Sequence, residues 1–314
     1  MIIKMHRSII SITLNPSIDV TLWTDGLRTD EVNRVVDETR EVGGKGINVS
    51  RVVNSFGQQT LCITVAGKEN CREFAGYLER ESLRYEFIQI EGSVRENLTL
   101  RTDGETIKIN RKGPALSAMM IGALMALIQS RIRPGDIVVF AGSLPDNVSA
   151  EDYIELIMAV RQAGVLIAVD SDLLTVDDYR KIKPWLIKPN IHELRRIVKP
   201  DGESIDDIAK AAMSLCEAGV ENVLVSLGGN GMVYVSKDKK IRAVVPSVEV
   251  KSTVGAGDSS LAGFLVGFIK ENSAEDCVRL AAACGTASAM QDGTRLATRK
   301  TADEIIGRIK ITVL

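Results

Sequence analysis

Apolar and polar residues follow one another along the chain in a pattern that predicts strands and helices in alternation. Short apolar runs, typical of buried strands, cover Ile9–Thr13, Leu61–Ala66, Asp136–Ala141, Leu166–Asp170, Trp185–Lys188 and Asn222–Ser226. Longer segments with helical spacing lie between them, at Ile47–Phe56, Glu69–Glu81, Ala118–Ser130, Ala150–Ala163 and Ile205–Ala218. This alternation predicts an α/β fold with a mostly parallel sheet and helices on both of its faces.

Two stretches do not fit this rhythm. Strand-like alternating segments occur at Val20–Trp23, Asn33–Thr39, Leu98–Arg101 and Thr106–Asn110. The dipeptide Asp103-Gly104 separates the last two, and a D-G pair in that position is a strong hairpin signal. We therefore expect a single α/β domain over residues 1–314, with a small β lid inserted from about residues 16–40 and 95–112.

Composition narrows the class of protein. The formal net charge of the 314 residues is −2, with no long run of one sign, so neither a nucleic acid nor a membrane surface is indicated as a partner. The five cysteines form no C-x-x-C pair, and there are only two histidines. These counts argue against a disulfide framework, a zinc site and Ser-His-Asp chemistry. No stretch approaches 18 apolar residues, so we expect a cytoplasmic protein.

The segment Thr253-Val254-Gly255-Ala256-Gly257-Asp258 is the most informative of the chain. It follows a short strand-like run and precedes a small-residue apolar helix, expected from Ser259 to about Lys270. Free backbone N–H groups at such a helix start can bind an anion, and Asp258 beside them could serve as a general base. Transfer of a phosphoryl group to a hydroxyl needs this combination. The alternative is that Asp258 only caps the helix.

Two further segments follow predicted strands near the N-terminus. Asp19, in Asn15-Pro16-Ser17-Ile18-Asp19, comes just after the first strand, where α/β sheets bind ligands. It could hold sugar hydroxyls, or the segment is an ordinary turn. Gly43-Gly44-Lys45-Gly46-Ile47-Asn48 opens a helix but lacks the P-loop spacing. Its glycines would let the backbone approach a ligand, with Lys45 adding charge and Asn48 hydrogen bonds.

Two more segments lie in the second half. Lys188-Pro189-Asn190-Ile191-His192-Glu193 either faces a nucleotide phosphate with its Mg²⁺ or simply starts a helix capped by Asn190. Ser226-Leu227-Gly228-Gly229-Asn230-Gly231 is either a nucleotide-facing loop or a glycine turn between strands. Each segment alone is a weak signal, but several such loops at strand ends, together with Gly255–Asp258, favour a phosphoryl-transfer site.

In order along the chain, Thr13–Pro16, Gly43–Val49, Gly142–Pro145, Lys188–Asn190 and Thr253–Asp258 resemble the motifs of the ribokinase-like (PfkB) carbohydrate kinases. The resemblance runs from about residue 9 to residue 296. It is strongest for the hexose-phosphate branch and, within it, for the 1-phosphofructokinases. It implies a Rossmann-type sheet, a β lid that often pairs with a second subunit's lid in a homodimer, and ATP with Mg²⁺ as cofactors.

The resemblance also implies a role for individual residues. Asp258 would be the base, and the N–H groups of Gly255, Ala256 and Gly257 would form the anion hole. The sugar phosphate would be bound by Asp19, Gly43, Gly44, Lys45, Asn48, Arg95 and Ser143, with Lys45 and Arg95 placed for its phosphate. ATP would be bound by Lys188, Asn190, Ser226, Gly228, Gly231 and Thr253, and Glu193 would act on Mg²⁺ through water.

These roles predict a kinase acting on a ketohexose monophosphate, with fructose 1-phosphate converted to fructose 1,6-bisphosphate as the first expectation. Tagatose 6-phosphate and fructose 6-phosphate are the alternative acceptors. A sensor that binds a sugar phosphate without turnover is the alternative of another class. Three places depart from the family's pattern. Asn110-Arg111-Lys112-Gly113-Pro114 stands where N-x-P-G-P is usual and adds two positive charges beside the lid. Ala141 stands where a serine is common, and Val169-Asp170-Ser171-Asp172 lacks a glycine that is often present.

Overall fold

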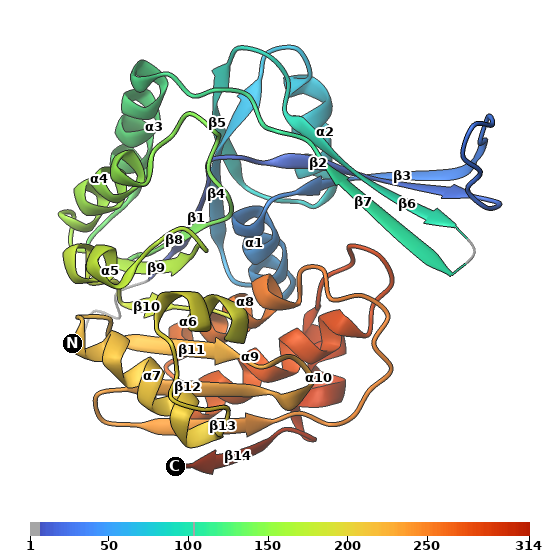
Figure 1. Cartoon of the computed structure of the whole chain (residues 1–314). Helices are drawn as coiled ribbons and strands as arrows, with labels where there is room; N and C mark the ends of the chain where they lie inside the picture. The colour runs from blue at the N-terminus through green and yellow to red at the C-terminus, as the bar shows by residue number, and fades with distance from the viewer. Residues whose placement is uncertain (1–6, 103) are drawn as a thin grey trace.

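The computed structural model describes residues 7–102 and 104–314 and contains a ten-stranded sheet (Figure 1). The strand order is β14-β13-β12-β11-β10-β9-β8-β1-β4-β5. Neighbours from β5 through β11 pair in parallel, and β12, β13 and β14 are added antiparallel at one edge. The strands are β1 (Ile9–Thr13), β4 (Thr60–Gly67), β5 (Tyr85–Ile90), β8 (Ile137–Ala141), β9 (Leu166–Asp170), β10 (Leu186–Ile187), β11 (Asn222–Ser226), β12 (Met232–Ser236), β13 (Lys240–Val244) and β14 (Lys310–Val313).

Helices cover both faces of this sheet. The cluster of buried side chains on one face includes residues of α3 (Ala118–Arg131), α4 (Ala150–Arg161), α5 (Val176–Ile182), α6 (Ile191–Ile197) and α7 (Ile205–Glu217). The cluster on the other face includes residues of α1 (Lys45–Ser55), α8 (Ala256–Ile269), α9 (Ala274–Ala289) and α10 (Arg299–Ile306). The expected α/β class, with a mostly parallel sheet covered on both faces, is confirmed.

A second sheet of four strands projects from the body (Figure 1). Its order is β3 (Val35–Gly43), β2 (Ser17–Thr24), β6 (Arg95–Thr102) and β7 (Glu105–Asn110). Ile18, Val20 and Val42 form a third apolar cluster with α2 (Cys71–Arg80), which anchors the base of the sheet. We call this four-stranded sheet the lid. Of the expected hairpin pair, Gly104 has a φ of 83°, and Asp103 lies outside the described residues.

Some elements differ from expectation. Helix α8 begins at Ala256, three residues before the predicted Ser259, so Asp258 lies inside its first turn. The hydrophobic pattern also gave no indication of α5, α9, α10, β13 or β14. Helices α8 and α9 are buried on nearly every side, and such helices lack the polar stripe that makes a helical period visible in sequence. Within the described ranges, no helix is long and apolar enough to cross a membrane.

Candidate active site

The start of α8 forms a backbone anion cradle. Gly255 precedes the helix with a φ of 72°, a left-handed conformation that favours glycine, and a Cβ there would collide with Leu296. The N–H groups of the first turn have no partner within the helix, and the helix dipole adds positive potential at this end. A Cβ on Gly257 would lie 3.1 Å from Lys188 Nζ. Glycine therefore leaves space for an anion between the helix start and a lysine, and the residues present fit a phosphate group.

Asp258 is 6% exposed and faces this cradle. Asn48 donates a hydrogen bond to its Oδ2 at 2.8 Å, and the Asp258 side chain accepts no capping bond from the backbone at the helix start. Asp258 therefore does not cap α8, which was the alternative interpretation. Burial, followed by the negative charge of Asp170, raises the Asp258 pKa to about 6. A carboxylate with a pKa of this size is better matched to proton transfer near neutral pH than an ordinary aspartate.

Asp170 ends β9 and holds two lysines. Its Oδ1 lies 3.1 Å from Lys45 Nζ, and its Oδ2 lies 3.2 Å from Lys188 Nζ. Burial opposes ionisation of Asp170, but the charges of Lys188 and Lys45 outweigh it and hold the pKa below its usual value. Although burial disfavours its charged form, the neighbouring carboxylates keep the pKa of Lys45 above its usual value. Two ammonium groups are thus fixed beside Asp258 and the helix start.

Asp19 lies on the lid strand β2. Ser17 Oγ donates to its Oδ1 at 2.8 Å, and Asn97 Nδ2 donates to the same oxygen at 3.0 Å. Burial raises the Asp19 pKa despite these bonds. A Cβ on Gly43 would overlap the Asp19 carboxylate, so only glycine permits the close approach of β3 at this point. Oδ2 has no donor among the described residues, which leaves an acceptor for substrate hydroxyls.

Arg95 opens the next lid strand, β6, in register with Ser17. It donates to the backbone carbonyls of Asn15 and Arg111, each at 3.2 Å, and to Ser143 Oγ at 3.4 Å. Asn15 Nδ2 also donates to Ser143 Oγ, at 3.3 Å. Within the described part of the chain, Arg95 forms no ion pair, and burial lowers its pKa. The guanidinium is therefore held in place by neutral groups, and the nearby Asp19 carboxylate interacts with it only through its charge.

The two predicted nucleotide loops lie side by side. Asn190 and Ser226 form an isolated parallel bridge, and Ser226 N donates to Pro189 O at 3.0 Å. The Asn190 side chain caps α6, while the Glu193 carboxylate accepts the N–H of Asn190 at 2.8 Å, completing a capping box. Gly228 and Gly231, both with positive φ, make the turn from β11 to the antiparallel β12. The helix-start and glycine-turn interpretations are therefore correct descriptions of the local structure, and nucleotide binding at these loops stays a prediction.

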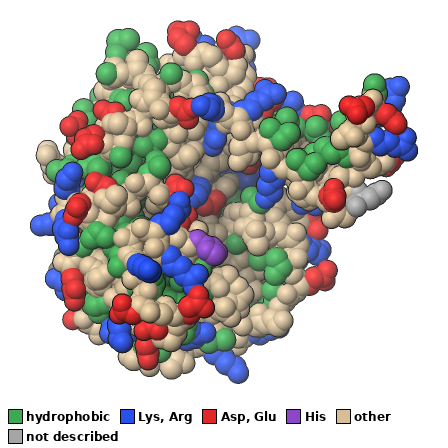
Figure 2. Space-filling model, in the orientation of Figure 1, with side chains coloured by type: hydrophobic (Ala, Val, Ile, Leu, Met, Phe, Trp, Pro, Cys, Tyr) green, Lys and Arg blue, Asp and Glu red, His purple; other side chains and the backbone are tan. Residues whose placement is uncertain are grey.

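The structure gathers the predicted site residues into two groups. Gly255–Gly257, Lys45, Asn48 and Lys188 surround Asp258, whereas the lid residues Gly43, Asp19 and Arg95 form a second group with Ser143 of the body. Lys45, predicted beside the acceptor phosphate, has its ion pair in the first group. Gly44 is the N-cap of α1 and follows Gly43 of the second group. Thr253 adjoins the first group, since its carbonyl oxygen accepts the N–H of Ala256 at 3.4 Å. Figure 2 shows the molecule hollowed between the lid and the body.

Sequence reasoning gave no role to Asp170, Asn97 or Asn15. Asp170 could have been predicted, because it is the last residue of a buried strand. Ligand-binding residues are expected at such strand ends, as was predicted for Asp19 after the strand that ends at Thr13. Asn97 carried no signal, since its contact with Asp19 depends on the pairing of β2 with β6 across a separation of 78 residues.

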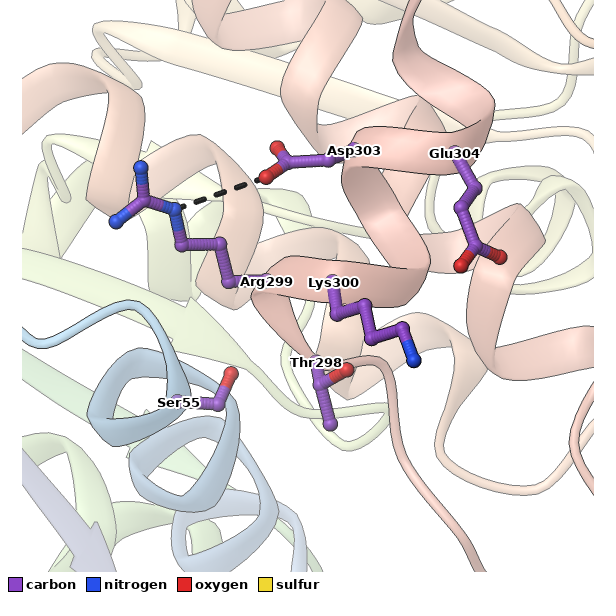
Figure 3. Close-up of a pocket in the computed structure, with 6 residues that line it drawn as sticks. All are labelled: Ser55, Thr298, Arg299, Lys300, Asp303 and Glu304. Carbon is purple, nitrogen blue, oxygen red and sulfur yellow. Dashed lines mark ion pairs between the residues drawn. The ribbon is translucent and has the colours of Figure 1, made fainter.

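A depression of about 670 Å³ lies at the start of α10 (Figure 3). Its lining residues are Ser55, Thr298, Arg299, Lys300, Asp303 and Glu304. None of them is a predicted site residue, and Arg299 already pairs with Asp303 at 3.7 Å. We assign this depression no part in the chemistry.

A helix start suited to an anion, a buried aspartate with a raised pKa and two lysines held by Asp170 are the groups that an α/β phosphotransferase needs. The pfkB family carbohydrate kinase profile matches residues 8–301. The chain is 32% identical to the 1-phosphofructokinase of Bacillus subtilis over 306 residues, which cover 98% of this chain and 100% of that protein. Identity to the tagatose-6-phosphate kinase of Staphylococcus epidermidis is 28%, covering 96% and 99%.

A solved structure of phosphofructokinase-2 from Escherichia coli, in complex with substrates and products, superposes with a TM-score of 0.89. It shares 30% sequence identity, and the match covers 95% of this chain and 98% of that one. The chain belongs to the pfkB family of carbohydrate kinases.

Proposed function

We propose that this chain is an ATP- and Mg²⁺-dependent kinase that adds a second phosphate to a ketohexose monophosphate, with fructose 1-phosphate converted to fructose 1,6-bisphosphate. The observation that carries the proposal is Arg95. A half-buried guanidinium that forms no ion pair with a described residue, beside the sugar-binding candidate Asp19, is suited to bidentate binding of a phosphate. A kinase for a neutral sugar would leave this charge without a use.

In the proposed reaction, Asp19 holds sugar hydroxyls, Arg95 and Ser143 hold the existing phosphate, and the free hydroxyl is directed at Asp258. Asp258 accepts the proton of that hydroxyl as its oxygen attacks the γ-phosphoryl group. Asn48 fixes the carboxylate through Oδ2, so proton transfer goes to the other oxygen, Oδ1. The N–H groups of residues 255–257 stabilise the charge on the transferring group.

For the donor, we propose that Lys188, Asn190, Ser226, Gly228, Gly231 and Thr253 bind ATP. Lys45 is better placed for the transferring phosphoryl group than for the acceptor phosphate, because Asp170 holds it beside Asp258. Among the described residues, no three acidic, histidine or cysteine side chains could together hold a metal ion. This suits Mg²⁺, which kinases hold mainly through nucleotide phosphates and water, with Glu193 acting through water. The ion would neutralise charge on the phosphates.

The lid supports a proposal about assembly. Val35, Val36 and Ile109 are 49%, 58% and 53% exposed on its outer strands, β3 and β7. Such apolar side chains on a projecting sheet suit a second lid as partner, and we propose a homodimer. A tetrameric inhibited form is known for the Escherichia coli phosphofructokinase-2. Light scattering on the wild type and on Val36→Asp/Ile109→Asp tests this proposal, because the double variant should be monomeric.

The experiment for the activity is an ADP-release assay with fructose 1-phosphate, fructose 6-phosphate, tagatose 6-phosphate, ribose and adenosine. The proposal expects the highest kcat/KM for fructose 1-phosphate and little turnover of the two neutral acceptors. One relative, 28% identical, is named a tagatose-6-phosphate kinase. A preference for tagatose 6-phosphate would change the proposed acceptor, but the protein would still be a sugar-phosphate kinase. Phosphosugar binding without ADP release would indicate a sensor instead.

A further inference from the structure

Asn15 contacts both of the residues proposed to bind the acceptor phosphate. It lies just after β1 and is only 6% exposed. Its backbone carbonyl accepts a hydrogen bond from Arg95 Nη2 at 3.2 Å, and its side-chain Nδ2 donates to Ser143 Oγ at 3.3 Å. One buried residue therefore joins lid strand β6 to the loop that follows β8.

The Asn15 amide can take only one orientation. Its Nδ2 also donates to the backbone carbonyl of Leu144 at 3.2 Å. A carbonyl oxygen only accepts hydrogen bonds, so the amide nitrogen, and not the amide oxygen, must face Leu144. The same nitrogen faces Ser143 Oγ, and the serine oxygen must therefore be the acceptor of that bond.

This orientation determines what the Ser143 hydroxyl can do. Its oxygen accepts N–H groups from Asn15 and from Arg95 Nη2, the latter at 3.4 Å. A hydroxyl has two acceptor positions and one proton, and neither of these partners can accept the proton. Among the described residues, Ser143 Oγ donates no hydrogen bond, and the residue is exposed. Its proton is therefore available to a ligand, next to the Arg95 guanidinium.

Segment 110–114, which departs from the family's pattern, supports this arrangement with its backbone. Arg111 O accepts a hydrogen bond from Arg95 Nη1 at 3.2 Å. A Cβ on Gly113 would overlap Asn15 Oδ1, so only glycine fits there. The side chains of Arg111 and Lys112 are exposed, and each pairs with a carboxylate. The segment therefore contributes to this corner through its backbone, whatever side chains it carries at positions 111 and 112.

We propose that Asn15 is a positioning residue of the acceptor-phosphate site, which makes Ser143 a hydrogen-bond donor and holds Arg95 beside it. A phosphate oxygen placed there meets a hydroxyl and a guanidinium that both donate to it. This inference rests on the proposed function and deepens it, because it states what prepares the site for a phosphate. Asn15→Asp should reverse the preparation, since a carboxylate accepts the Ser143 proton and adds a negative charge beside the phosphate.

Titration calorimetry without nucleotide tests the proposal on the full chain, with fructose 1-phosphate, fructose 6-phosphate and tagatose 6-phosphate as probes. For the sugar phosphate that binds the wild type most tightly, we expect Kd to rise about 30-fold in Asn15→Asp and about tenfold in Asn15→Ala. The KM for ATP should stay within about twofold of the wild type, because Asn15 touches no residue proposed for the donor.

Asn147→Ala is the matched control. The Asn147 side chain holds the backbone of Leu116 through two hydrogen bonds, so this variant also loses an amide that braces the loop after β8. It loses no contact with Ser143 or Arg95, and its Kd for the sugar phosphate should equal that of the wild type. Circular dichroism melts establish that all variants fold.

A double-mutant cycle separates positioning from a purely structural role. If Asn15 acts through the Ser143 hydroxyl, Asn15→Ala should change Kd less than about twofold in the Ser143→Ala background. An equal loss in both backgrounds, or an unchanged Kd in Asn15→Asp, would overturn the inference and leave the proposed kinase activity standing. A wild type that binds none of the three sugar phosphates would overturn both. Because calorimetry measures binding alone, the role of Asn15 is tested even where ADP release fails.

Discussion

The two halves of the site are built in opposite ways. On the body side, Asp258, Asp170 and Lys188 are each at most 6% exposed, and each charged group has a partner. On the lid side, Arg95 is held by backbone carbonyls, and among the described residues it forms no ion pair. A partnered, buried cluster keeps one geometry without a ligand, whereas an unpartnered cation favours a ligand that brings the missing charge. We infer that the body half carries the chemistry common to the family and the lid half selects the acceptor.

The largest expected effect is at the body half. Asp258→Asn removes the base, and kcat should fall about a thousandfold with little change in substrate KM. The folded-state pKa of about 6 lies above the ordinary value of 3.8, so ionisation of Asp258 costs stability as pH rises through this window. The variant should therefore be as stable as the wild type or more so at pH 7. Stopped-time assays with calorimetric melts measure both quantities, and an active Asp258→Asn enzyme would contradict the assignment.

For the same reason, the wild-type kcat should decrease as pH falls through about 6, where Asp258 becomes protonated. Asp170→Asn should move this midpoint to lower pH, because it removes a negative charge and frees two lysines beside Asp258. It should also lower the free energy of unfolding by about 3 kcal/mol, mainly because the buried ammonium group of Lys188 loses its partner. Asp172→Asn is the matched control, as Asp172 is exposed and pairs with the exposed Arg196 at 3.8 Å. An unmoved midpoint would show that Asp170 does not set the acidity of the base.

At the lid half, Arg95→Ala should raise KM for the sugar phosphate by about 10- to 100-fold, as expected for a charged hydrogen bond, with kcat less affected. Arg111→Ala is the control, because that side chain is 59% exposed and pairs with Glu96 at 3.5 Å. Steady-state kinetics on both variants distinguish phosphate binding from a general effect on lid charge. Equal KM values in the two variants would remove Arg95 from the acceptor site.

The smallest effect is expected at a contact that joins the halves. Thr294 Oγ1, near the end of the chain, donates a hydrogen bond to the Glu41 carboxylate on lid strand β3. Thr294→Val removes this bond and should raise the sugar-phosphate KM by about fivefold, corresponding to about 1 kcal/mol. Thr312→Val, on an exposed edge strand, should leave KM unchanged. A Thr294→Val enzyme with wild-type KM would mean that this contact does not hold the lid in its binding position.

Sequence reasoning predicted the body half more fully than the lid half. The strand–glycine–helix segments at Gly43–Asn48 and Gly255–Asp258 are local signals, because strand end, turn and helix start are contiguous in the chain. Their meeting was also predictable, since parallel strands bring their carboxyl ends to one edge of a sheet. Asp170 was missed although the same rule applies to it.

The lid half depends on pairing that no local pattern encodes. Asn97 reaches Asp19 only because β2 and β6 are paired in parallel, and Asn15 reaches Ser143 across 128 residues. Lys45 was expected beside the acceptor phosphate, but its ion pair with Asp170 depends on where α1 packs against the main sheet. For each of these residues, the sequence gave the type of side chain but not the residue that it contacts.

One short turn connects the lid to the base. Strand β3 ends at Gly43, α1 begins at Lys45, and only Gly44 separates the lid from the helix that carries Asn48. Any rotation of the lid about this turn would displace the first turn of α1. It would therefore also change the hydrogen bond from Asn48 to Asp258. Because that bond lowers the Asp258 pKa, the pKa of Asp258 would depend on the position of the lid. An open lid would then make Asp258 easier to protonate, and this could be followed by its carboxyl titration in the absence of any reaction.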